Sequence, residues 1–357
     1  MSGSIKGRGA AIQTANPYLK VQIEKDLEHV EGDEEYLAEL GRPPTQYLVD
    51  ESQSIVAEND SPDIGFRYSV NPYRGCSHGC SYCYARPGHE YLGMSAGLDF
   101  ETKVLVKHRA PELLREFLAK PSWTPETIAF SGVTDCYQPA EREFRITRGC
   151  VAVAAECNQP IGIVTKNALV CRDIDLLQKL AGHHAVRVSI SITTLDAKLA
   201  RTMEPRTSSP ESRLRAIREL SAAGISTNVM TSPIVPGIND SEIPAILTAA
   251  REAGADHASY VMLRLPTTVR PVFVDWLERC YPDKAERVKS LIRSVRSGQM
   301  SDSEFGRRQV GTGNMAELIA NTFDLWAKKL GFNEHRWPLN AAAFQPPPPT
   351  SGQLRLF

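Results

Sequence analysis

The sequence lacks several features that would assign it to a class at once. It has no apolar run approaching the ~20 residues that a membrane span needs, and Met1 to Lys20 contain no apolar core of signal-peptide length. The formal net charge is only −1, so no overall field attracts nucleic acid or an anionic membrane, although a local basic groove remains compatible with it. We therefore expect a cytoplasmic protein without a membrane partner.

The chain also lacks an internal repeat and a second pair of closely spaced cysteines. It has eight cysteines in 357 residues, and without a signal peptide such a number does not indicate a disulfide framework. Only Cys76, Cys80 and Cys83 are clustered, whereas the other five are scattered. Clustered thiols in a reducing compartment indicate a metal site.

Short strand-like runs alternate with helix-like segments from about residue 64 onwards. The predicted strands are Phe66–Val70, Thr127–Ser131, Ile161–Thr165, Val186–Thr193, Ser226–Met230 and Ser259–Leu263. The predicted helices between them are Pro111–Lys120, Arg142–Cys157, Arg172–Ala181, Ser209–Ala223 and Asp240–Ala253. This alternation predicts an α/β protein with a parallel sheet or barrel.

The segments that flank this α/β region differ from it in predicted secondary structure. Helices are predicted at Pro271–Cys280, Asp283–Arg296 and Ser303–Leu330, the last interrupted near Gly311 and Gly313. We therefore predict four parts: an irregular N-terminal arm (1–60), an α/β domain (61–266), a helical C-terminal extension (267–340) and a Pro-rich disordered tail (341–357).

The strongest chemical signal is the stretch from Gly75 to Tyr84, which holds the cysteines in a CxxxCxxC spacing. Three thiolates can bind three irons of an iron–sulfur cubane and leave the fourth iron open, whereas electron-transfer clusters mostly use four cysteines. The alternative is a zinc site with His78 or a distant residue as the fourth ligand.

A CxxxCxxC loop with an aromatic residue before its last cysteine, after the first strand of an α/β series, resembles the radical S-adenosylmethionine (SAM) superfamily. Within it, residues 64–265 most resemble the spore photoproduct lyase group and its uncharacterised bacterial relatives. The resemblance implies a partial parallel (βα)6 barrel, with a [4Fe-4S] cluster on Cys76, Cys80 and Cys83. It also implies that the cluster, reduced by an external electron donor, cleaves SAM to a 5′-deoxyadenosyl radical.

Polar residues at the ends of the predicted strands are the candidates for holding SAM. Matched to the family, Thr134 and Asp135 would contact the amino group of SAM, and Lys166 its carboxylate. Ser189 and Ser191 alternate with apolar residues and so face one side of the sheet, where Ser191 matches a family serine at the ribose. Turn residues, a solvated lysine and buried structural serines are the alternatives.

The resemblance also bears on hydrogen transfer. Tyr82 and Tyr84 flank Cys83 as in the lyase, where such tyrosines relay a hydrogen atom; packing against the cluster is the simpler role. The lyase's hydrogen-donor cysteine falls near Gly132, and Cys136 is the nearest alternative here, either as the donor or as a buried spectator. This departure argues against repair of the spore type.

The last five residues form the pattern QLxLF, which resembles the peptide that docks bacterial repair proteins on the replicative sliding clamp. Gln353 would supply a polar anchor, and Leu354, Leu356 and Phe357 would enter an apolar groove. The alternative is a tail that folds back on the protein itself. Clamp binding would favour a DNA substrate, with Lys6 and Arg8 among the phosphate contacts.

Three functions remain open from the sequence. The first is a radical SAM enzyme that abstracts hydrogen from a DNA lesion, in a lyase-like DNA repair reaction. The second is a radical SAM enzyme that modifies RNA, a protein or a small molecule. The third is a non-enzymatic, metal-stabilised nucleic-acid adaptor.

Overall fold

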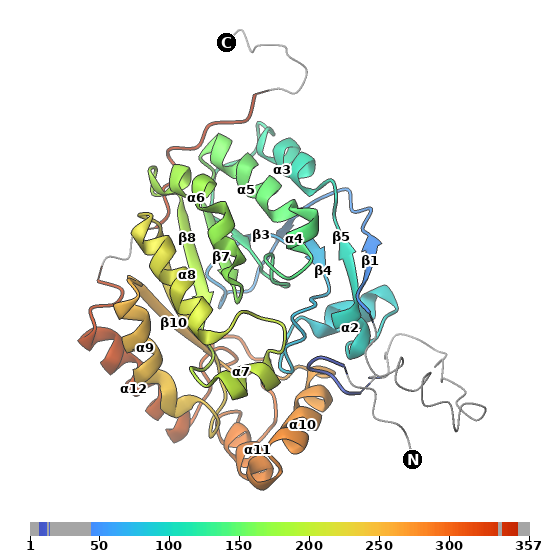
Figure 1. Cartoon of the computed structure of the whole chain (residues 1–357), viewed down its shortest axis with the longest axis vertical. Helices are drawn as coiled ribbons and strands as arrows, with labels where there is room; N and C mark the ends of the chain where they lie inside the picture. Colours follow the sequence, from blue (N-terminus) through green and yellow to red (C-terminus); the bar gives the residue numbers. More distant parts are fainter. Residues whose placement is uncertain (1–6, 13, 15–43, 335–337, 349–357) are drawn as a thin grey trace, which may run out of the picture.

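The computed structural model describes residues 7–12, 14, 44–334 and 338–348. Its centre is a seven-stranded sheet in the order β10-β9-β8-β7-β6-β3-β2 (Figure 1). The strands are β2 (Val56–Glu58), β3 (Tyr68–Val70), β6 (Ile128–Phe130), β7 (Ile161–Thr165), β8 (Val186–Ser191), β9 (Ser226–Ile234) and β10 (His257–Met262). All pairings are parallel except β2 with β3. The predicted α/β fold is confirmed, and each predicted strand overlaps one parallel strand.

Helices lie along one face of this sheet (Figure 1). They are α3 (Ala110–Leu118), α4 (Glu141–Phe144), α5 (Ile146–Cys157), α6 (Ile174–Ala181), α8 (Pro210–Ala222) and α9 (Ile243–Glu252), with 3-10 turns η2 (Ala168–Asp173) and η3 (Asp240–Glu242). The predicted helix 142–157 is divided into α4 and α5, because Arg145 between them has a left-handed backbone with φ 53°. The connecting helix α7 (Ala197–Met203) was not predicted.

The two faces of the sheet differ in chemistry. In β8, Val188 and Ile190 are fully buried in the main hydrophobic core, whereas Ser189 and Ser191 alternate with them and face the other side. Ser189 is in register with Asn228 of β9, so the polar face continues onto the neighbouring strand. The sheet therefore has an apolar face towards the helices and a polar face opposite them.

A second sheet lies beside the first, with the order β1-β5-β4. It contains β1 (Gln46–Val49), β4 (Tyr73–Arg74) and β5 (Lys103–Val106). The helix α2 (Leu98–Thr102) leads directly into β5 and contacts the 3-10 turn η1 (Arg86–Leu92). The expectation that residues 1–60 are irregular is therefore wrong for β1 and β2. Both strands are short and largely exposed, so their sequences carry no apolar periodicity that would predict them. They form because β1 pairs with β5 and β2 pairs with β3.

Helices dominate the C-terminal part, as predicted. They are α10 (Val269–Cys280), α11 (Ala285–Ser294) and α12 (Asn314–Lys329), with the turn η4 (Pro282–Lys284) before α11. The predicted helix 303–330 begins only at Asn314, because Gly311 and Gly313 have φ near 80°. No helix among the described residues is long and apolar enough to cross a membrane.

Candidate functional site

The three clustered cysteines lie on the loop of residues 75–84, the cluster loop, which follows β4. Their thiols are free, and those of Cys76 and Cys80 are buried. Cys76 and Cys83 pack around Phe100, and Cys83 also joins the apolar cluster that contains Cys80. The three thiols thus lie close enough for Cys76 and Cys83 to act electrostatically on Cys80.

Side chains from outside the cluster loop hold its backbone in place. The buried guanidinium of Arg86 donates to the carbonyl oxygens of Cys80 at 2.8 Å and Gly97 at 2.9 Å. The buried amide of Gln138 accepts from Ser77 N and donates to the carbonyl oxygen of Gly75, both at 2.9 Å. Arg86 and Gln138 therefore satisfy and fix backbone groups of Gly75, Ser77 and Cys80 within the cluster loop.

Residues 7–12, the N-terminal strap, cover the cluster loop. The carboxylate of Glu101 accepts from Gly9 N at 3.0 Å and from Ala10 N at 2.8 Å. Arg8, expected to touch phosphate, instead donates to the carbonyl oxygens of Ser77 and Glu101, and burial lowers its pKa to about 10. Lys6 lies outside the described residues.

The donor set fits a cluster with three protein ligands. Burial, and then the nearby Cys76, raise the pKa of the Cys83 thiol to about 11, so iron would have to displace its proton. Within the described ranges, no three His, Cys, Asp or Glu side chains are placed to share a single metal ion. In a cubane each thiolate binds its own iron, so the three sulfurs need only surround the cluster.

His78, the alternative fourth ligand for zinc, contacts the Cys76 side chain and is also held by two residues outside the cluster loop. Its Nδ1 lies 3.4 Å from the Asp135 carboxylate, and its Nε2 lies 3.3 Å from the side-chain amide of Asn167. Asp135 also accepts from the Thr165 hydroxyl at 2.7 Å and from Lys166 N at 2.8 Å. Burial alone would raise the pKa of Asp135, but His78 and these donors lower it to about 2.

The predicted SAM contacts divide into two groups. Asp135 is satisfied as described, and the Thr134 hydroxyl donates to the carbonyl oxygen of Tyr73 at 2.7 Å, so both polar groups have protein partners. The ammonium of Lys166 has no hydrogen-bond or ion-pair partner in the described part of the chain and lies 5.7 Å from the centre of the Tyr82 ring. Lys166 is therefore available to bind an anion beside the cluster loop.

The two serines of β8 lie on the polar face of the sheet, as the alternation predicts. Ser189 accepts from the Asn228 amide at 3.0 Å, and the buried Ser191 donates to the carbonyl oxygen of Ser232 at 2.9 Å. Both hydroxyls thus join β8 to β9 at the side where SAM is expected.

A buried ion pair supports Tyr82. Glu204 accepts from the Tyr82 hydroxyl, from the Thr193 hydroxyl at 2.5 Å and from the Arg213 guanidinium at 2.5 Å. Burial would raise the pKa of Glu204, but Arg213 and Lys166 lower it overall, so this buried carboxyl stays ionised. Reasoning from sequence missed Arg213, because its position in α8 carries no sign that the side chain points inwards.

The hydrogen-transfer candidates occupy different surroundings. Cys136 is fully buried at the main hydrophobic core, where the Ser131 side chain also contacts its thiol. Tyr84 is 47% exposed, and its hydroxyl donates to the carbonyl oxygen of Gly132 at 2.9 Å. The structure therefore places the Tyr84 hydroxyl against the backbone of Gly132 and leaves Cys136 buried.

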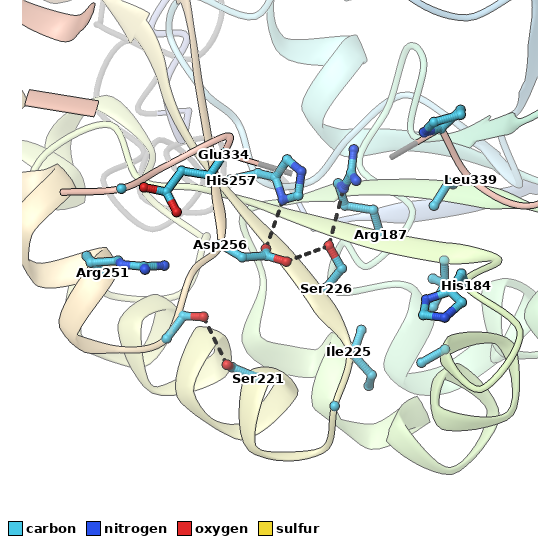
Figure 2. A pocket seen from close by; sticks show the side chains of 16 residues that line it. His184, Arg187, Ser221, Ile225, Ser226, Arg251, Asp256, His257, Glu334 and Leu339 are labelled. Carbon is cyan, nitrogen blue, oxygen red and sulfur yellow. Dashed lines mark hydrogen bonds and ion pairs between the residues drawn. The ribbon is translucent and has the colours of Figure 1, made fainter. Parts of the chain in front are cut away.

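A cavity of about 580 Å³ lies elsewhere. Figure 2 shows Asp256 bonded to Ser226 and His257 on its wall, with Arg187 reaching the same serine. Ser226 and His257 are the first residues of β9 and β10, so this cavity opens at the amino ends of the strands. The cluster loop, through His78 and Asp135, reaches Thr165 at the carboxyl end of β7. In α/β folds chemistry belongs to the carboxyl ends, whereas the opposite face serves stability.

Residues 70–250 match the model of the radical SAM superfamily, and the chain belongs to that family. Its members use a [4Fe-4S] cluster and SAM, so the predicted cofactors and the enzymatic nature of the protein are confirmed.

An uncharacterised protein of Mycobacterium bovis is 39% identical over 232 residues, which cover 64% of this chain and 68% of the relative. An uncharacterised protein of Methanocaldococcus jannaschii is 28% identical over 226 residues, covering 63% and 81%. A radical SAM Nalpha-GlyT isomerase of Pseudomonas phage M6 is 25% identical over 233 residues, covering 64% and 46%.

The fold is similar to that of spore photoproduct lyase. In its complex with dinucleoside spore photoproduct, the lyase superposes with a TM-score of 0.58 at 16% identity, covering 80% of each chain. At this identity the likeness concerns the fold alone.

Proposed function

We propose that the protein is a radical SAM enzyme whose substrate is a nucleotide of DNA, in a lesion-repair reaction. The observation that carries the proposal is the meeting of three neighbouring thiols with the unpaired ammonium of Lys166 at the carboxyl ends of parallel strands. Two relatives support the substrate class: one carries the name Nalpha-GlyT isomerase, and the lyase of similar fold binds a dinucleoside. RNA, protein and small-molecule substrates are the alternative.

A reduced cluster held here would supply the electron for cleavage of SAM to methionine and a 5′-deoxyadenosyl radical. Cys76, Cys80 and Cys83 would hold the cluster, and Lys166 would bind the carboxylate of SAM. Ser189 and Ser191 would line the ribose side. Thr134 and Asp135 would support the site without contacting SAM through their side chains. These side chains are already bonded to Tyr73, beside the cluster loop, to His78 within it and to the end of β7.

The chain's own residues would otherwise exclude water and keep the site rigid. The N-terminal strap and the apolar cluster around Cys80 and Tyr82 cover the cluster loop, and we propose that the sheet curves around the site as a partial barrel of residues 61–266. Tyr82, held by Glu204, would pack beside the cofactors. Tyr84 would face the substrate, while Cys136 stays a buried spectator.

Anaerobic reconstitution tests the proposal. The enzyme should bind about four irons per chain and, once reduced, convert SAM to 5′-deoxyadenosine. One zinc per chain with intact SAM would contradict the proposal. A screen of damaged DNA for products that require both SAM and reductant then tests the substrate, and product only with RNA or protein would refute the DNA assignment.

We also propose that the tail Gln353, Leu354, Leu356 and Phe357, which lies outside the described residues, docks on a bacterial sliding clamp. Its pattern at the end of a Pro-rich segment supports this partner. Deleting residues 353–357 should abolish binding to purified clamp while leaving iron content unchanged. Equal binding by the intact and deleted proteins would refute the proposal.

A further inference from the structure

Arg264 is a cation next to the cluster loop that forms no direct ion pair among the described residues. It follows β10 at the carboxyl end, and its guanidinium carbon lies 5.7 Å from the centre of the Tyr84 ring. Its side chain has no hydrogen bond or ion pair among the described residues. Burial, and then the nearby Arg308, lower the pKa of Arg264, and Tyr84 and Asp63 oppose this shift only in part. The nearby carboxylate of Asp63 is already paired with Arg308.

Neighbouring arginines are bound within the protein. Arg308 forms a bidentate ion pair with Asp63 at 2.5 and 2.7 Å, and Arg307 pairs with Asp302 at 3.3 Å. The buried Arg296 donates to carbonyl oxygens of Leu263 and Arg307. Arg264 differs from them because no carboxylate or carbonyl oxygen among the described residues contacts its guanidinium directly.

Exposed apolar surface lies beside this charge. Tyr84 is held by the carbonyl oxygen of Gly132, next to Val133, which is also 47% exposed. Phe305 is exposed as well and lies under the guanidinium of Arg308, 4.5 Å from the ring centre. The exposed Tyr84 ring, directly after the cluster ligand Cys83, lies beside the unpaired Arg264 guanidinium. Together the two groups match a ligand that combines a flat ring with an anion.

We propose that Arg264 and Tyr84 form a nucleotide-binding site at the entrance to the cluster, with Arg264 on a backbone phosphate and Tyr84 against a base. This assignment rests on the proposed function and names the contacts of its substrate. A purely apolar substrate would leave Arg264 uncompensated, whereas a small anion would not use the ring.

Binding of a short fluorescein-labelled DNA single strand to the reconstituted holoprotein, with SAM and across a range of salt concentrations, tests the site. Arg264→Gln should weaken binding about tenfold at low salt and reduce the slope of log K against log salt by about 0.7, the value for one phosphate of a single strand. Tyr84→Leu should weaken binding without changing the slope, and Tyr84→Phe should retain it.

Arg279→Gln is the matched control, because Arg279 is exposed on α10 and paired with Asp275. It should bind as the wild type does. Iron content and melting temperature of each variant establish that the fold is intact, and Tyr84→Leu still tests the site if Arg264→Gln fails to fold.

Two failures are distinguishable. If the wild type forms no 5′-deoxyadenosine from SAM and reductant, the proposed function falls whatever the binding result. If it forms 5′-deoxyadenosine but does not bind DNA, or if Arg264→Gln binds with unchanged affinity and slope, the nucleotide site is refuted while the enzyme class stands.

Discussion

Replacing Glu204 with alanine should destabilise the protein by about 3–5 kcal/mol, the usual cost of leaving a buried charge without its partner. Both Glu204 and Arg213 are at most 1% exposed, and their charged atoms are 2.5 Å apart. The variant would leave the buried Arg213 guanidinium without its carboxylate partner. It would also remove the acceptor of the Tyr82 and Thr193 hydroxyls. Because all three partners contact the same carboxylate, the free-energy costs of losing these contacts do not simply add.

Urea unfolding of anaerobically prepared protein, followed by circular dichroism at matched iron content, measures this loss. Glu58→Ala is the control, because Glu58 and its partner Arg67 are 58% and 54% exposed and such a pair contributes at most about 1 kcal/mol. The double variant Glu204→Leu, Arg213→Met should recover most of the loss, since no charge remains buried.

The reasoning would be refuted by a loss below about 1 kcal/mol in Glu204→Ala, because a buried unpaired guanidinium cannot cost so little. It would equally be refuted if the double variant were no more stable than Glu204→Ala. In that case packing, and not charge, would account for the effect.

Three further outcomes follow from single residues. Cys80→Ala should lose most of its iron by chemical analysis, whereas Cys171→Ala, at a half-buried site outside the cluster loop, should keep it. Gly9→Ala would place a methyl carbon 1.7 Å from a carbonyl oxygen of the cluster loop, so iron should be lost faster in air than from Gly65→Ala, which meets nothing within 4 Å. Burial would raise the pKa of Asp256, but its partners lower it below 3.8, so its stabilisation is present above that pH and lost below it. The difference in melting temperature between wild type and Asp256→Asn should therefore narrow as the pH falls through that range, and a constant difference would contradict this.

The parallel strands could be predicted because their signal is local. A strand such as β7 (Ile161–Thr165) is a continuous apolar run followed by a helix, and its predicted bounds match the structure. The second sheet could not be predicted, because β4 has two residues and β1 pairs with a strand more than fifty residues away. Such pairing depends on tertiary contacts that no local pattern records.

The candidate site divides in the same way. The cysteines and Lys166 carry their chemistry in a local motif or at a strand end, and the structure brings them together. Asp135 was placed at the right end of the sheet, but its carboxylate is used by His78 and Lys166 N. The supports of the cluster loop, Arg86 and Gln138, lacked a sequence signal because each acts on a backbone atom.

Two buried ion pairs lie against the cluster loop and help to hold its backbone in place. Among the described ion pairs, only Arg86–Glu101 and Arg213–Glu204 have both side chains at most 1% exposed, and both pairs contact this loop. Buried pairs contribute little to stability, because desolvation offsets their attraction, so stability alone does not explain their concentration here. They do fix a backbone that must present three thiolates in one geometry. Burial raises the pKa of the Cys80 and Cys83 thiols, and Glu204 raises that of Cys80 further. The unpaired ammonium of Lys166 opposes this rise in part, in the direction of the thiolate form that iron requires.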